Sequence, residues 1–96
     1  MVIRIADLVG AADTGDQGAI VYRRISMGLR RGGPIVISFS GITTATSSFV
    51  NAGFAELLRD HPFSEIKDRL RVIDSTHQIN DMIRTRLNGE ASKAAA

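Results

Sequence analysis

The feature that most constrains the fold is the apolar run Ile35–Phe39, which lies between two segments with helical periodicity. The run follows Gly32-Gly33-Pro34, is rich in β-branched residues and is too short for a helix. Such a run is typical of a strand that is buried on both faces of a parallel sheet. The sequence therefore predicts an α/β protein in which helices cover the sheet.

The segment before this strand predicts an amphipathic helix. Val21, Ile25 and Leu29 recur at four-residue spacing and form one apolar stripe. Asp16 is a suitable N-cap near the start of the helix, and Gly32-Gly33 end it. Nearer the amino terminus, Val2–Ile5 predicts a short first strand, and residues 6–18 predict a loop or an irregular second strand.

The segments after the central strand continue the alternation. Residues 40–46 predict a loop, and a second helix follows that ends before His61-Pro62. The apolar face of this helix comprises Val50, Phe54, Leu57 and Leu58. Leu70–Ile73 predicts another strand, and a third helix is expected to begin at a cap formed by Asp74 or Ser75 and to end at Asn88-Gly89.

This order of elements predicts one α/β domain over residues 1–90, with a flexible C-terminal tail at residues 91–96. Parallel neighbours with right-handed crossovers give a small, mostly parallel sheet of about four strands, packed by about three helices. A length of 96 residues accommodates one such core.

Composition excludes several classes of function. The chain has no cysteine, so disulfides, thiolate metal sites and cysteine nucleophiles are excluded. No apolar run approaches the roughly 20 residues of a membrane helix, and no signal peptide is recognisable, so a cytoplasmic location is expected. The 12 basic and 10 acidic residues are interspersed, which favours a solvated surface over nucleic-acid binding.

Residues 38–49 form the segment with the highest density of functional groups, since seven of these twelve residues carry a hydroxyl group. They lie between a buried strand and the start of a helix, where backbone N–H groups lack intrahelical partners and carry partial positive charge. A hydroxyl oxygen there is either a helix cap or a neighbour of a bound anion. A phosphoserine is also well tolerated at this position, and the residues alone do not distinguish a cap from a phosphoacceptor.

Residues 35–58 resemble the central segment of STAS domains, the fold shared by sulfate-transporter tails and bacterial anti-sigma factor antagonists. Ser40-Gly41-Ile42 resembles the turn of that family, and Thr46-Ser47-Ser48-Phe49 falls on its Asp-Ser-Ser-Gly motif. A looser likeness extends from about residue 13 to residue 87. The Ser-Ser-Phe sequence is closer to the prokaryotic STAS-like domain of unknown function than to the antagonists proper.

The resemblance implies a non-enzymatic regulatory domain that binds a protein partner. In the antagonists the first serine of the motif is phosphorylated by a GHKL-type ATPase, which implies Ser47 as phosphoacceptor and Ser48 as second candidate. The implied partner is such a serine kinase or an anti-sigma factor. The implied contact surface lies within residues 43–54 and comprises Thr44, Thr46, Phe49, Asn51 and Phe54.

This sequence departs from the antagonist motif at three positions. Thr46 replaces the motif aspartate, Phe49 replaces the motif glycine, and Ser38 replaces the aspartate that usually ends the strand. Phe49 is expected to place a large ring where a partner would approach.

Other chemistry is not favoured by the pattern of residues. His61 and His77 lack the spacing of a metal site or a catalytic triad, and no catalytic residue, metal or cofactor is expected. Asp74-Ser75-Thr76 is interpreted as a helix cap that is also a candidate for the surface around Ser47, because it follows the carboxyl end of a strand. The alternative function is a small-molecule or anion sensor that uses the N–H groups of the second helix and arginine side chains.

Overall fold

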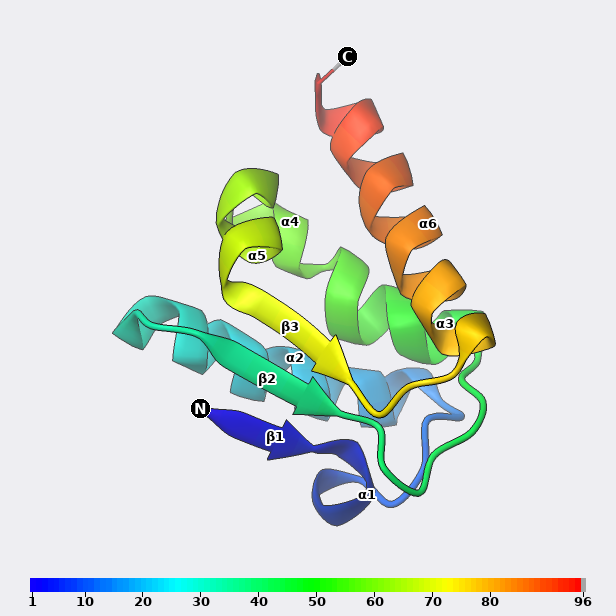
Figure 1. Ribbon diagram of the computed structural model, residues 1–96. Coiled ribbons are helices and arrows are strands. Elements are labelled where there is room, and N and C mark those ends of the chain that lie inside the picture. Colours follow the sequence, from blue (N-terminus) through cyan, green and yellow to red (C-terminus); the bar gives the residue numbers. More distant parts are fainter. Residues whose placement is uncertain (96) are drawn as a thin grey trace.

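The computed structural model describes residues 1–95, and the side chains of residues 1–89. It is an α/β domain in which the helix of residues 15–31 lies behind a small sheet (Figure 1). The elements in chain order are β1 (Val2–Arg4), α1 (Ile5–Leu8), α2 (Gly15–Arg31), β2 (Ile35–Ser38), α3 (Ser47–Val50), the π-helix η1 (Asn51–Ala55), α4 (Leu57–Asp60), α5 (Phe63–Arg69), β3 (Leu70–Ile73) and α6 (His77–Ala95).

The sheet of the described chain has three parallel strands in the order β1-β2-β3, one fewer than the expected number of about four. Val2 lies opposite Val36, and Ile35 lies opposite Leu70. Because the strands are parallel and adjacent in sequence order, each pair is joined by a crossover that contains helix. The carboxyl ends of all three strands therefore meet at one edge of the sheet (Figure 1).

One face of this sheet is buried and the other is largely open. Ile3, Ile35 and Ile37 point to the helices and are at most 5% exposed. On the opposite face Val2 is 69% exposed, and Val36 of the central strand is half-buried. The prediction that the central strand is buried on both faces is therefore wrong for Val36, because the helices pack on one face only (Figure 1).

Helix α2 begins and ends close to the predicted positions. Its N-cap is Thr14 rather than Asp16: the Thr14 hydroxyl accepts from the Gln17 N–H, and the Gln17 side chain accepts from the Thr14 N–H. This reciprocal pair is a capping box. Gly32 follows the last helical residue with a φ of 87°, as expected for a glycine that ends a helix.

The second predicted helix consists of α3, η1 and α4, which follow one another from Ser47 to Asp60. In η1 the Glu56 N–H donates to the Asn51 carbonyl at 3.2 Å, a five-residue step that widens the turn. This segment crosses α2 at very short range. A Cβ added to Gly18 would lie 2.4 Å from the Phe49 carbonyl oxygen, and one added to Gly53 would lie 3.2 Å from the Gly18 carbonyl oxygen. A side chain at position 18 would therefore force the neighbouring backbone to move, and one at position 53 would make a tight contact.

Two other local predictions are corrected, and one helix lies where no element was predicted. Residues 5–8 form the short helix α1 instead of loop or strand. Phe63–Arg69 forms α5 directly before β3, and it is this helix that was not predicted. Helix α6 continues past Asn88-Gly89 to Ala95, because glycine is tolerated inside a long helix. The flexible tail predicted for residues 91–96 stays a prediction, because the side chains of these residues lie outside the described part of the chain.

Candidate functional site

The loop between β2 and α3 begins at the carboxyl edge of the sheet. Phe39 is fully buried, and its N–H donates to the Ile73 carbonyl of β3 at 3.1 Å. The chain then turns sharply, with the Ile42 N–H donating to the Phe39 carbonyl at 2.8 Å. Gly41 in this turn has a φ of 85°, a conformation that favours glycine. The turn directs residues 43–46 across the ends of three helices.

Helix α6 holds this loop from one side. The Gln78 side chain accepts from the Ala45 N–H at 3.1 Å and donates to the Ala45 carbonyl at 3.0 Å. The Thr76 hydroxyl donates to the Thr43 carbonyl at 3.0 Å and also accepts from the Ile79 N–H at 3.3 Å. Thr76 is therefore the residue that caps α6, in place of the predicted Asp74 or Ser75.

The segment before α2 holds the loop from the other side. The Thr46 N–H donates to the Ala12 carbonyl at 3.0 Å, and the Thr46 hydroxyl donates to the Asp13 carbonyl at 2.8 Å. A Cβ on Gly15, the first residue of α2, would lie 3.9 Å from the Ser48 carbonyl oxygen. The amino ends of α2, α3 and α6 thus converge on residues 43–48 (Figure 1). Their partial positive charges are directed to one surface.

Capping of α3 is carried out by Thr46. Its hydroxyl accepts from the Phe49 N–H at 3.2 Å, and its carbonyl accepts from the Val50 N–H at 3.1 Å. Ser47 and Ser48 are exposed, and within the described residues their hydroxyls make no hydrogen bond to the protein. Among the hydroxyl groups of this segment, that of Thr46 therefore caps the helix, whereas those of Ser47 and Ser48 have no partner among the described residues.

The predicted partner-binding residues fall into two groups. Thr44, Thr46 and Asn51 are exposed near the two serines. The side chains of Phe49 and Phe54 are 0% exposed, and their ring centroids lie 6.4 Å apart in the core. The expectation that the Phe49 ring meets a partner is therefore wrong, because this ring is packed inside the core next to Phe54.

A carboxylate nevertheless lies at the end of the central strand. The Ser38 hydroxyl donates to Asp74 Oδ2 at 2.9 Å and accepts from the Ser40 N–H at 3.3 Å. Asp74 has a φ of 56°, which is uncommon for a residue other than glycine. Asp74 and Thr76 therefore join the ends of β2 and β3 to the loop, as the position of Asp74-Ser75-Thr76 in the sequence indicated.

A second polar cluster, on the side of α2 away from this loop, could not be found from the sequence. Ser26 Oγ and His61 Nε2 lie 3.0 Å apart, and both residues are buried. Next to them the Tyr22 hydroxyl donates to Asp60, and this hydrogen bond, followed by burial, raises the Tyr22 pKa above its ordinary value. No local motif signals these contacts, because α2 and the end of α4 are distant in sequence. The cluster joins α2 to the end of α4.

Metal and membrane sites are not found in the described part of the molecule. No group of three His, Asp or Glu side chains there could hold a metal ion. Between residues 1 and 95, no helix combines the length and the apolar character needed to cross a membrane.

The fold and the loop define a class of protein: an α/β domain whose central parallel strand leads through a hydroxyl-rich turn into a capped helix. The chain belongs to a STAS-like family, since the family model described as a STAS-like domain of unknown function (DUF4325) matches residues 17–80. This match runs from the first turn of α2 into the first turn of α6 and confirms the resemblance seen in the sequence. Comparisons with curated proteins and with solved structures give no match.

Proposed function

We propose that this chain is a non-enzymatic regulatory domain that binds a protein partner through residues 43–48 and the start of α3, and that phosphorylation of Ser47 or Ser48 switches this binding. The observation that carries the proposal is that three neighbouring hydroxyl groups have different roles. Thr46 caps α3, whereas Ser47 and Ser48 are exposed with free hydroxyls. A kinase could reach either serine without breaking the cap.

The surroundings of these serines suit a switch. Residues 43–46 are held by α6 and by the segment before α2, so the surface that a partner meets is ordered before binding. A phosphoryl group adds about −1.5 to −2 charges next to the converging helix ends, which favour negative charge. The modification is thus expected to change the surface without unfolding the helix. The partner that the resemblance suggests is a GHKL-type serine kinase or an anti-sigma factor, in the cytoplasm of a bacterial cell.

The test compares four baits in the native host: wild type, Ser47→Asp, Ser48→Asp and Ser64→Asp. Ser64 is the matched control, since it is exposed in the first turn of α5 just as Ser48 is in α3. We expect wild type and Ser64→Asp to retain the same partner, and one of the other two to lose it with unchanged circular dichroism. Phosphopeptide mapping of the chain from the same host should identify the same serine. Equal capture by all four baits would reject the switch.

A second candidate function is an anion sensor at the same place, favoured by the convergence of the amino ends of α2, α3 and α6 (Figure 1). In that case phosphate or sulfate should raise the midpoint of thermal unfolding more than chloride does at equal ionic strength. Ser47→Pro should abolish this difference, since proline removes the N–H of the first residue of α3 while remaining compatible with a helix start. An equal response to the three anions would exclude the sensor and leave the phosphorylation switch untouched.

A further inference from the structure

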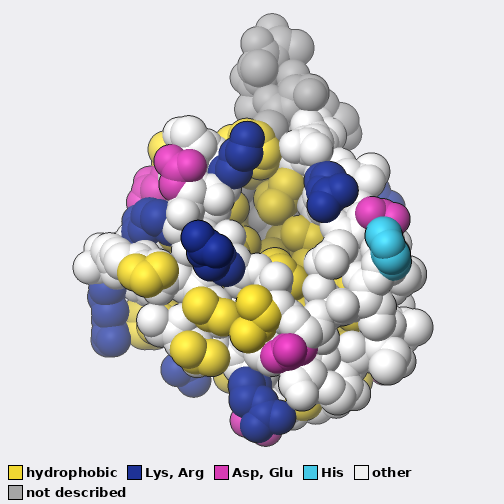
Figure 2. Space-filling model, in the orientation of Figure 1, with side chains coloured by type: hydrophobic (Ala, Val, Ile, Leu, Met, Phe, Trp, Pro, Cys, Tyr) yellow, Lys and Arg dark blue, Asp and Glu magenta, His cyan; other side chains and the backbone are white. Residues whose placement is uncertain are grey.

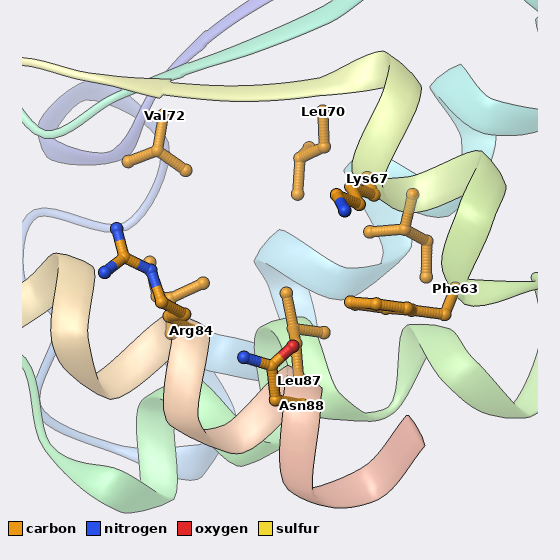
Figure 3. Close-up of a pocket in the computed structure, with 9 residues that line it drawn as sticks. Phe63, Lys67, Leu70, Val72, Arg84, Leu87 and Asn88 are labelled. Atoms are coloured by element: carbon orange, nitrogen blue, oxygen red, sulfur yellow. The ribbon is translucent and has the colours of Figure 1, made fainter. Parts of the chain in front are cut away.

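A hydrophobic groove lies along the edge of β3 that does not pair with β2. Its volume is about 400 Å³, and it is bounded by β3, α5 and α6. Figure 2 shows it as a hollow with hydrophobic side chains inside and basic side chains on its rim. The lining residues are Phe63, Ile66, Lys67, Leu70, Val72, Ile83, Arg84, Leu87 and Asn88 (Figure 3).

The backbone of β3 at this groove is available for a further strand. The Ile73 carbonyl accepts from Phe39 N–H, so the polar groups of Ile73 point to β2. Because these directions alternate along a parallel strand, the N–H and carbonyl of Val72 and the carbonyl of Leu70 point outward. The Leu70 N–H is already used, since it donates to the Ile66 carbonyl at the end of α5. The outer edge of β3 thus offers one donor and two acceptors.

The side chains next to this edge are apolar and only partly covered. Leu70 and Val72 are half-buried and line the groove, and in Figure 3 Leu70 points towards Leu87 of α6. A strand added beside β3 would place every second side chain over the same hollow. Its backbone would satisfy the outward groups of Val72, and its alternate side chains would bury the apolar lining.

The charged side chains of the groove restrict the sequence of a strand that could bind there. Of the side chains that the structure describes, Lys67 and Arg84 are the charged ones that line the groove, and none of the described lining residues is acidic. Among the side chains at positions 1–89, neither cation forms an ion pair, and the nearby Asp68 and Asp81 lie outside the lining. In Figure 3 Lys67 lies near Leu70, and Arg84 lies near Val72, so the two cations flank the apolar section.

We propose that this groove binds an extended, acidic segment of a partner protein, which adds to β3 as a fourth strand. Its alternate apolar side chains would fill the hollow, and its acidic residues would meet Lys67 and Arg84. A second copy of this chain does not fit equally well, because two-fold pairing of β3 with itself would bring the same cations together. The groove shares no lining residue with the loop at residues 43–48, so the proposal is independent of the phosphorylation switch.

The experiment titrates the isotopically labelled chain with two peptides and follows backbone amide signals by NMR, which detects millimolar affinity. Each peptide has about ten residues, with alternating valine and threonine in the centre. One peptide carries glutamate at both ends and the other carries lysine. We expect the glutamate peptide to bind at least about tenfold more tightly, which corresponds to about 1.4 kcal/mol, and to shift the Val72 amide. The amides of β1, whose outer edge is also unpaired, serve as the internal control.

Two further measurements separate strand addition from other modes of binding. The double variant Lys67→Glu with Arg84→Glu changes exposed side chains and should reverse the preference between the peptides. Methylation of alternate peptide nitrogens should abolish binding, because it removes the donors to β3 without altering the protein.

Several outcomes would overturn the proposal. These are equal affinity for the two peptides, no shift at Val72, an equal response at β1, or undiminished binding of the methylated peptide. Binding of dodecanoate to the groove in preference to the glutamate peptide would assign the site to an amphiphilic small molecule. Concentration-dependent dimerisation that Val72→Pro abolishes would assign the edge to self-association.

Discussion

The side-chain amide of Gln78 pairs with both backbone polar groups of Ala45, at 3.1 Å and 3.0 Å, and so substitutes for a strand partner at that residue. Ala45 is 6% exposed, and its backbone has no regular element to pair with. This contact fixes the loop after β2 to the first turn of α6. It therefore determines the shape of the surface that presents Ser47 and Ser48.

Replacing Gln78 by alanine should destabilise the fold and loosen this loop. Two backbone groups of a buried residue would lose their partner, at a cost of about 1–3 kcal/mol in the free energy of unfolding. Urea denaturation measures this loss of stability. The rate of hydrogen exchange at the Ala45 amide should rise by at least the factor to which this free-energy loss corresponds. His77→Ala, one residue earlier and exposed, is the control and should change neither quantity. Equal effects of the two variants would show that the amide contact has no special role.

The hydroxyls of Thr46 and Ser47 should differ sharply when each is removed. Thr46→Ala deletes the cap of α3 and the hydrogen bond to the Asp13 carbonyl, so we expect a loss of about 1–2 kcal/mol. Ser47→Ala removes an exposed hydroxyl without a protein partner, so its effect should stay within about 0.5 kcal/mol. Chemical denaturation of the two variants measures the difference. A larger loss for Ser47→Ala would mean that Ser47 is structural, which argues against its use as a phosphoacceptor.

The crossing of α2 and η1 should not tolerate a single added methyl group. In Gly18→Ala the new Cβ meets the Phe49 carbonyl oxygen at 2.4 Å and the Ala52 Cβ at 2.9 Å, so the helices must separate. We expect a destabilisation of at least about 1–3 kcal/mol. The matched control is Gly89→Ala in α6, where the added Cβ would meet no atom within 4 Å apart from the adjacent residues and the backbone of its own helix, and alanine should stabilise the helix by about 0.5–1 kcal/mol. Effects of the same sign in thermal unfolding would contradict the close crossing.

The pKa of Tyr22 predicts how stability changes at alkaline pH. The neutral phenol donates to Asp60, whereas the phenolate would place two negative charges together, so the folded-state pKa is raised above the ordinary value of about 10. The stabilisation is complete below the unfolded-state pKa and is lost as the pH rises through the folded-state pKa. Tyr22 is the single tyrosine, so tyrosinate absorbance reports it directly. Asp60→Asn should bring the inflection back towards the ordinary value, and an unchanged inflection would disprove the contact.

Strong local patterns accounted for the elements that were predicted correctly. Helix α2 has a regular apolar stripe that ends at Gly32, and β2 has a β-branched run after Pro34. Helix α5 has only two strongly apolar residues, Phe63 and Ile66, which are too few to define a period.

The candidate site was predicted in position but not in detail. The hydroxyl-rich segment could be located because it follows β2 directly, whereas its contacts come from segments about thirty residues away, such as Ala12 and Gln78. Phe49 was misplaced because its role was inferred from the glycine of a related motif rather than from the helix face that it shares with Val50. The groove beside β3 depends on the order of the strands, which no local pattern encodes.

The parallel register also determines when the sheet can form as the chain leaves the ribosome. Val2 pairs with Val36, and Ile35 pairs with Leu70, so neither pairing is possible until a complete intervening helical segment has been synthesised. Helix α2 has its own capping box and can form first, and it then carries β2 back to β1. Loop closure over these distances, rather than formation of any single helix, should therefore limit the rate of folding.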